Sequence, residues 1–330
     1  MARHGFVLLE PGGDFLAIHA ASVSQGWLGR QMTRQIDIQG HRGARGLFPE
    51  STLEGFLAAA ALGVTAFELD VGMTADGIVV VCHDPALNPD LVRGTAGAWL
   101  EGPGPLLRSL TCQELQAYDV GRLRPGSPTA ALFPGQRPID GARIPTLAAV
   151  LAALPAARFT IEVKSDPRHP ERTAPPTVLA DATLAVIDAA GAAARVTIES
   201  FDWRVQRHVR RRRPDVRLAW LTRAETVRES ALWWDGIVDV ASIPACVAAE
   251  GGPVWAPDAA DLTEAQVREA HAVGLSVLPW TVNTPADMVR LVAWDVDGLI
   301  SDRPDLALSC VGPGQPGAVS GYRSAASIIL

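Results

Sequence analysis

The chain has 330 residues, of which 48% are hydrophobic and 20% are charged, so it can bury a large core and is neither disordered nor fibrous. Its formal net charge of −7 argues against a surface built to meet nucleic acid or an anionic membrane, and we expect neither as a partner. Apolar runs stay short of the ~18 residues that cross a bilayer, and Glu10 interrupts the apolar start before it reaches the length of a signal-peptide core, so we expect a cytoplasmic protein without a membrane anchor.

Composition divides the chain into a central region and two flanking segments. Residues 1–33 lack clear periodicity, and Met32 directly precedes the first clean strand, so this segment is either an extension or the result of a misassigned start. Residues 311–330 are rich in Gly, Pro and Ser and are expected to form a tail outside the core. The region between them, 34–310, has the pattern of one domain.

Short β-branched runs alternate with Ala- and Leu-rich stretches through this central region, which is typical of a parallel α/β fold. The runs predict strands over 35–39, 66–71, 78–82, 159–163, 195–200, 217–221, 238–242, 254–256, 275–280 and 298–301. Helices are expected after Pro49 and over 146–154, 178–190, 202–213, 263–273 and 285–294. Asp76 and Gly77 predict an antiparallel hairpin between the second and third strands. The alternation predicts a (β/α)8 TIM barrel.

Residues 84–143 interrupt this alternation. They are rich in Gly, Pro and Arg and contain one short helical stretch, near 111–118. Because a loop of such length is uncommon in a compact domain, an inserted cap explains the segment better. We therefore predict a small insertion subdomain over the C-terminal mouth of the barrel.

Charged side chains follow the ends of several predicted strands. They are His41 and Arg42 after the first strand, Glu68 and Asp70 within the second, His83 after the hairpin, and Glu162 and Lys164 at the end of the next long strand. Residues two apart on a strand point to the same face, so each of the pairs Glu68/Asp70 and Glu162/Lys164 shares a face. Because the C-terminal ends of barrel strands converge on one mouth, we expect all seven side chains to meet there.

Acidic side chains on one face need a common partner. An ion pair explains Glu68 or Asp70 taken alone, but the two together favour a bound cation, with Glu162 as a third ligand. Carboxylate ligation favours Mg²⁺ or Ca²⁺ over zinc, and Mn²⁺ also fits such a site. His41 and His83, each explicable alone as a packing residue, together face these acids and are candidates for acid–base catalysis.

Lys164 is the one lysine among the 29 basic residues of the chain. In so arginine-rich a sequence, a surface cation would be an arginine, so this position predicts a need for a compact ammonium. A point charge beside a metal ion, with Arg42 across the mouth, is suited to stabilising a phosphoryl oxygen.

Ten short motifs, in this order, resemble the glycerophosphodiester phosphodiesterase family from about Gln35 to Pro304. They are His41-Arg42-Gly43, Pro49-Glu50-Ser51-Thr52, Glu68-Leu69-Asp70-Val71, Thr74-x-Asp76-Gly77, His83-Asp84, Ile144-Pro145-Thr146-Leu147, Glu162-Val163-Lys164, Ser200-Phe201-Asp202, Trp280-Thr281-Val282-Asn283 and Ser301-Asp302-x-Pro304. The resemblance implies a TIM barrel with a small insertion, one divalent cation held by Glu68, Asp70 and Glu162, and His41 and His83 as the acid–base pair. The family usually has Asn where Ser51 stands, and we expect Ser51 to cap a helix in its place.

The activity implied is hydrolysis of a glycerophosphodiester, a small molecule, to sn-glycerol 3-phosphate and an alcohol. Arg42, Lys164 and the metal ion would neutralise the phosphoryl oxygens, and Phe201 and Trp280 are candidates for an apolar wall that holds the glycerol or the leaving group. Two alternatives remain at this point: a related barrel phosphodiesterase that acts on lysophospholipids, and a barrel that binds phosphoesters without turnover. The sequence leaves the choice of nucleophile open, between water and the substrate's own glycerol hydroxyl.

Overall fold

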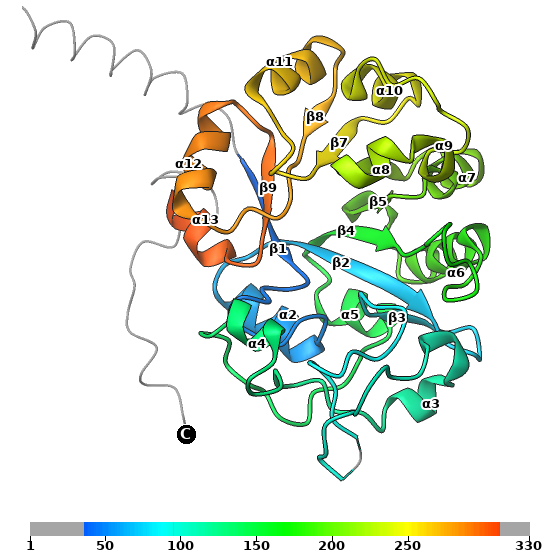
Figure 1. The fold of residues 1–330 in the computed structure, drawn as a ribbon, viewed down its shortest axis with the longest axis vertical. Coiled ribbons are helices and arrows are strands. Elements are labelled where there is room, and N and C mark those ends of the chain that lie inside the picture. Colours follow the sequence, from blue (N-terminus) through cyan, green and yellow to red (C-terminus); the bar gives the residue numbers. More distant parts are fainter. Residues whose placement is uncertain (1–35, 95, 311–330) are drawn as a thin grey trace, which may run out of the picture. The chain divides into compact units, whose positions relative to one another are not determined.

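The structure, a computed structural model of the chain, describes residues 36–94 and 96–310. The N-terminal extension expected over 1–33 and the tail expected over 311–330 lie outside the described residues. The region in between forms the α/β domain shown in Figure 1.

A single nine-stranded sheet forms the centre of this domain. In chain order its strands are β1 (Asp37–His41), β2 (Ala66–Met73), β3 (Val79–Val81), β4 (Arg158–Val163), β5 (Val196–Ser200), β6 (Arg217–Thr222), β7 (Val254–Pro257), β8 (Ser276–Val277) and β9 (Gly298–Ser301). Apart from β3, the strands pair in parallel in the order β8-β7-β6-β5-β4-β2-β1-β9. The sheet closes into a barrel between β9 and the residues that follow β8, where the Ile300 amide donates a hydrogen bond to the Pro279 carbonyl at 3.0 Å. The predicted TIM barrel is therefore confirmed.

Helices cover the outside of the barrel. They are α2 (Leu53–Ala61), α5 (Leu147–Ala153), α6 (Pro176–Ala189), α7 (Trp203–Arg212), α8 (Ala224–Arg228), α9 (Ser230–Trp233), α10 (Ile243–Ala249), α11 (Glu264–Ala272), α12 (Pro285–Ala293) and α13 (Pro304–Cys310). Side chains along β2 alternate between the outer face of the barrel, which the helices cover, and its interior. Phe67, Leu69 and Val71 belong to the apolar layer beneath the helices. The buried Glu68 and Asp70 occupy the alternate positions, on the inner face.

The segment 84–143 lies between β3 and α5 and contains a 3₁₀ helix (Leu107–Ser109), α3 (Cys112–Leu115) and α4 (Pro128–Leu132). Strand β3 pairs with β2 in antiparallel fashion, as the Asp76-Gly77 turn predicted. The segment supplies most of an apolar cluster of its own, which includes Leu87, Leu107 and Leu115. It is thus packed around its own side chains, and in Figure 1 its helix α4 lies beside α2 while α3 lies below β3.

Two local predictions were wrong. The run 238–242 forms no strand, because Val238 is 80% exposed and Ser242 instead begins α10 as its N-cap. Ser51 does not cap α2, because Thr52 does so by accepting a hydrogen bond from the Gly55 amide at 3.0 Å. The Ser51 backbone is left-handed, with φ of +54°, and its hydroxyl is buried without a hydrogen-bond partner.

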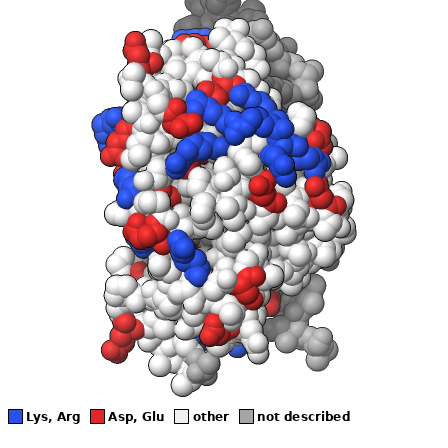
Figure 2. All heavy atoms as spheres, turned by 90° about the vertical axis from the view of Figure 1, so that its right-hand side faces the viewer, with Lys and Arg blue, Asp and Glu red and all other residues white. Residues whose placement is uncertain are grey.

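Basic side chains form a band across the face drawn in Figure 2, at the level of α7 and α9. On α7 these charges are largely balanced: Arg207 pairs with Glu250 and Asp235, and Arg212 lies 3.5 Å from Asp181. The band is therefore a network of ion pairs and not a field of one sign. Among the helices of residues 36–94 and 96–310, none has the length and apolar character that crossing a bilayer requires.

Candidate active site

Strand register brings the predicted acidic residues to one level inside the barrel. His41 on β1 lies opposite Glu68 on β2, and Asp70 on β2 lies opposite Glu162 on β4. The register continues one strand further, because Glu162 lies opposite Glu199 on β5. All five residues are buried, with at most 8% of the surface of each residue exposed. The alternation of β-strand side chains thus concentrates carboxylates in the barrel mouth.

Three of these carboxylates form one compact set. One oxygen atom each from Glu68, Asp70 and Glu162 lies within 4.8 Å of the other two. The sequence predicted that these three side chains would meet, and the structure brings them together.

Two cations lie directly against the carboxylates. The Lys164 ammonium lies 2.9 Å from Asp70 and 2.9 Å from Glu162, while the Arg42 guanidinium lies 3.1 Å from Asp70 and 2.9 Å from Glu50. Burial alone would raise the pKa of Asp70, but Lys164 and Arg42 outweigh it and hold that pKa well below its usual value. Against the effect of burial, the Asp70 and Glu162 carboxylates raise the pKa of Lys164. Both predicted cations therefore stay charged beside the acids.

The remaining carboxyl groups show that acids outnumber cations at this level. Burial and the neighbouring Asp70 carboxylate raise the pKa of Glu68 well above its usual value. Burial raises the pKa of Glu162 to about 7, although Lys164 opposes the shift. Glu199, beside Glu162 and Asp70, has a pKa raised well above normal for the same reason, and one of its buried oxygens has no hydrogen-bond partner. Additional positive charge would therefore stabilise this group of side chains.

His41 is held by a carboxylate on the far side from Glu68. Its Nδ1 lies 2.5 Å from an Asp302 oxygen, while its Nε2 lies 3.6 Å from Glu68. Asp302 is itself fixed by the Asn283 amide, which donates to its second oxygen at 2.7 Å, and by the Arg45 guanidinium at 2.7 Å. Burial lowers the pKa of His41, although the hydrogen bond to Asp302 opposes the shift. The ring is thereby fixed with Nε2 directed at the acidic set.

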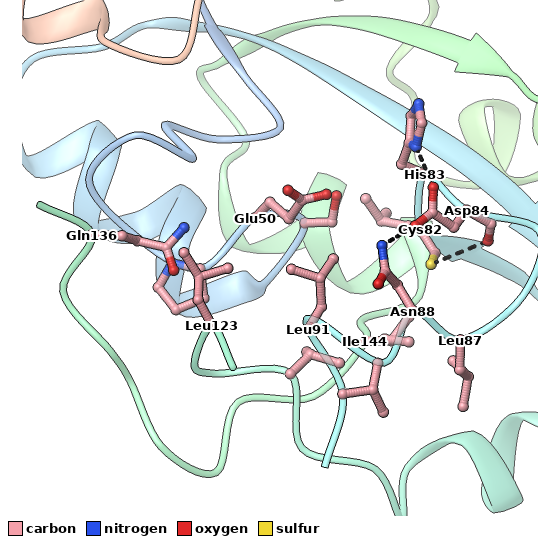
Figure 3. Close-up of a pocket in the computed structure, with 15 residues that line it drawn as sticks. Glu50, Cys82, His83, Asp84, Leu87, Asn88, Leu91, Leu123, Gln136 and Ile144 are labelled. Carbon is pink, nitrogen blue, oxygen red and sulfur yellow. Dashed lines mark hydrogen bonds and ion pairs between the residues drawn. The ribbon is translucent and has the colours of Figure 1, made fainter. Parts of the chain in front are cut away.

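His83 has the same arrangement on the other side of the mouth. Its Nδ1 lies 2.6 Å from Asp84, and the Asn88 amide donates to the other Asp84 oxygen at 2.8 Å, as the dashed lines in Figure 3 show. Burial, with the nearby Lys164 and Arg42 charges, lowers the pKa of His83 to about 4. Each predicted histidine therefore has an Asp behind it and an Asn behind that Asp.

The inserted segment supplies the residues that hold His83 through hydrogen bonds. Asp84 and Asn88 belong to its first residues, and they lie beside a small pocket of about 40 Å³ that includes Leu87 and Leu91 in its lining. Figure 3 shows Leu91 between Glu50 and Asn88, with Leu87 below Asn88. The apolar packing of the insertion thus fixes the position of the residues that hold His83.

A larger cavity of about 370 Å³ opens above the acidic set. His41, His83 and the acids line one part of it, and Phe201 and Trp280 line another. The two aromatic rings pack edge to face with their centroids 5.5 Å apart. The structure therefore places every site residue predicted from the sequence around one cavity.

Glu199, Asp302 and Asn283 were not predicted to be functional from the sequence. Asp302 and Asn283 stand in the motifs quoted above, but nothing local shows that residues near the C-terminus contact His41. Glu199 could have been found, because it is an acid inside a predicted buried strand, the same signal that marked Glu68. Cys82, next to His83, offers no reactive thiolate, because burial raises the pKa of its thiol to about 12.

Comparison with known proteins gives one consistent result. The model of the Glycerophosphoryl diester phosphodiesterase family matches residues 41–306. A Mycobacterium tuberculosis protein named "Probable glycerophosphodiester phosphodiesterase 2" is 31% identical over 276 residues, which cover 81% of this chain and 87% of that protein. A Bacillus subtilis glycerophosphodiester phosphodiesterase is 29% identical, over 81% of this chain and 83% of the other.

Solved structures agree with these sequence matches. The crystal structure of a "Putative glycerophosphoryl diester phosphodiesterase" from Silicibacter pomeroyi matches with a TM-score of 0.77 and 36% identity, over 84% of this chain and 94% of that one. An Oleispira antarctica phosphodiesterase, solved with the product sn-glycerol-3-phosphate, matches in fold with a TM-score of 0.62 and 21% identity, over 84% and 97% of the two chains.

Proposed function

Because this chain belongs to the glycerophosphoryl diester phosphodiesterase family and is an enzyme of that kind, we propose that it releases sn-glycerol 3-phosphate and a free alcohol with one divalent cation and a pair of histidines. The observation that carries the proposal is the convergence of three carboxylates and two histidines, each histidine backed by an Asp and an Asn, on one cavity. The Oleispira protein, which has the same fold, holds sn-glycerol-3-phosphate, and this is consistent with the proposed product.

The three carboxylates fit a divalent cation. Oxygen ligands of Mg²⁺ or Ca²⁺ lie at ~2.0–2.6 Å from the ion, so oxygens within 4.8 Å of one another can all bind the same ion. Hard carboxylate oxygens without a sulfur or imidazole ligand suit Mg²⁺, Ca²⁺ or Mn²⁺. Glu68, Asp70 and Glu162 would hold the ion, which when bound would supply positive charge to a phosphoryl oxygen.

Arg42 and Lys164 would complete the electrostatic part of the site. A phosphodiester anion gains charge on its oxygens as a nucleophile attacks, and fixed cations in a buried site stabilise that charge. Both side chains are anchored on Asp70, so they are oriented before substrate arrives. The Lys164 side chain is 18% exposed and lines the cavity, so its ammonium can contact a bound phosphate.

The histidines would transfer the protons. With Nδ1–H donated to Asp302 or Asp84, each ring keeps Nε2 free to accept or donate a proton. One histidine would take the proton of the attacking hydroxyl or water, and the other would give a proton to the leaving alkoxide. The two are held by different elements, His41 at the end of β1 and His83 after β3, so they would approach the substrate from different directions.

A coupled assay for sn-glycerol 3-phosphate tests this proposal. The protein is incubated with glycerophosphocholine, glycerophosphoethanolamine, glycerophosphoglycerol and glycerophosphoinositol, with and without a chelator, and then with Mg²⁺, Ca²⁺ or Mn²⁺ added back. We expect metal-dependent release from at least one substrate. Release of phosphocholine or phosphoethanolamine in place of sn-glycerol 3-phosphate, or no release from any substrate, would contradict the proposal.

A further inference from the structure

The part of the cavity away from the carboxylates is built by loop residues that the proposed reaction does not use. Phe201 follows β5, Arg223 follows β6, Arg168 lies between β4 and α6, and Trp233 ends α9. The Phe201 ring packs edge to face on Trp233, with centroids 6.3 Å apart, as it does on Trp280. These residues form an aromatic wall with two arginines beside it.

Guanidinium groups lie over two of the aromatic rings, those of Trp233 and Phe201. The Arg168 guanidinium lies 5.1 Å from the centre of the Trp233 ring, and the Arg223 guanidinium lies 5.1 Å from the centre of the Phe201 ring. An aromatic cage binds a quaternary ammonium through such faces. Because guanidinium groups lie over Trp233 and Phe201, a trimethylammonium head group would meet positive charge at these two rings.

Each of the two guanidiniums is only partly paired with a carboxylate. Glu225 accepts an ion pair from both Arg168 and Arg223, so one carboxylate serves two guanidiniums. Asp166 adds a longer contact to Arg168, at 3.4 Å, and Arg228 adds a further positive charge near Glu225. Because Glu229 and Asp261 also lie close by, bonded to the Trp233 indole and the Ala224 amide, these groups leave no net positive excess, but each guanidinium is only partly paired.

Both arginines keep hydrogen-bonding capacity toward the cavity. Their side chains are 34% and 36% exposed and line the cavity. Arginine presents its donors in a planar fork that matches the oxygens of a phosphate or carboxylate. The site is thus suited to an anionic group that contacts donors left free by Glu225.

We propose that this part of the cavity is a head-group subsite that favours glycerophosphodiesters whose alcohol carries a second phosphate, and disfavours those with a trimethylammonium group. The inference rests on the proposed function, because it names the class of substrate for the same site. The reactive phosphodiester lies at the carboxylates and Lys164, and the second phosphate contacts Arg168 and Arg223. A cavity of about 370 Å³ lies within the range of small-molecule sites.

The test compares two substrates that differ by one phosphate. Values of kcat/KM are measured for glycerophosphoinositol 4-phosphate and for glycerophosphoinositol, with glycerophosphocholine as the cationic head group. We expect the phosphorylated substrate to be favoured by at least about 10-fold over its unphosphorylated partner, and glycerophosphocholine to be the poorest of the three. A ratio of 1 or less between the two inositol substrates, with hydrolysis intact, overturns the subsite and leaves the proposed function standing.

Variants then assign any preference to the arginines. Arg168→Gln and Arg223→Gln should each bring the ratio toward 1, whereas Glu225→Gln, which frees both guanidiniums, should raise it. Arg290→Gln is the matched control, because Arg290 also covers an aromatic ring, that of Trp294 at 4.6 Å, and pairs with Asp287, but it lies on α12 and does not line the cavity. A ratio that stays high in both arginine variants would overturn the subsite. Failure to cleave any of the three substrates would instead contradict the proposed function.

Discussion

The two parts of the cavity are built in different ways. The carboxylates lie on β2, β4 and β5, where backbone pairing on both sides fixes each side chain. The arginines and the aromatic wall stand on the segments that follow β4, β5, β6 and β8, and the contacts that hold them are ring packing and exposed ion pairs. A rigid frame suits groups that must be placed precisely for a chemical step, and connecting segments can vary with the alcohol that is released.

This contrast predicts that substitutions in the strands abolish turnover, whereas those in the loops change the choice of substrate. The largest effect is expected for Asp70→Asn, because Asp70 contacts both Lys164 and Arg42 and belongs to the set that would hold the metal ion. Activity should fall below detection, and calorimetry should show loss of divalent-cation binding. Asp215→Asn, an exposed acid paired with Arg213, is the control that should behave as the parent. Turnover of the parent protein in chelator would remove the metal ion from the site.

The histidines are expected to have the next largest effect. His41→Ala and His83→Ala should each lower kcat by ~10² to 10⁴, the usual contribution of a general acid or base. His208→Ala is the matched control, because His208 also contacts an aspartate, Asp181 at 2.8 Å, but lies on α7 outside the cavity. Thermal unfolding of all three variants distinguishes loss of catalysis from loss of structure. Near-parent kcat in either cavity variant would make that histidine structural.

The positioning of His41 can be tested separately from its chemistry. Asp302→Asn keeps the shape of the side chain but removes the charge that holds the ring, and Arg45 then keeps only its longer contact with a carboxylate, that of Glu50 at 3.8 Å. We expect kcat to fall by about 100-fold with KM changed much less, since the proton-transfer group is misaligned while the binding groups remain. A rise in KM of about 100-fold with unchanged kcat would show that Asp302 serves substrate binding and not the orientation of His41.

The same contrast explains how much the sequence could predict. Residues on strands were found because alternation and convergence at a barrel mouth are general rules, and Glu68, Asp70 and Glu162 follow them. Asp302 was given no role because its contact with His41 joins residues 261 positions apart, and no local pattern records such a contact. The arginines of the loops carry no periodic signal, so their contacts with aromatic rings appear only in the structure.

Local backbone choices were the other point that the sequence did not settle. Ser51 and Thr52 are both good capping residues, and only the fold shows that the chain enters α2 with Ser51 in a left-handed conformation and Thr52 as the cap. Asn adopts the left-handed region more readily than Ser does, which gives a backbone reason for the Asn that the family usually has at this position.

The smallest predicted effect tests the one lysine at the boundary between the two parts. Lys164 ends the strand-borne acidic set, and its ammonium fits between Asp70 and Glu162 at 2.9 Å from each. Lys164→Arg keeps the charge but adds length and a planar head, which cannot take the place of a point charge between two carboxylates in a buried site. We therefore expect kcat/KM to fall about 10-fold, or ~1.4 kcal/mol of transition-state stabilisation, with thermal stability little changed. Arg212→Lys, on the exposed end of α7, should leave the same assay unaffected. If Lys164→Arg turns over substrate like the parent, then charge alone matters at this position, and the geometry of the ammonium between the two acids contributes nothing to catalysis.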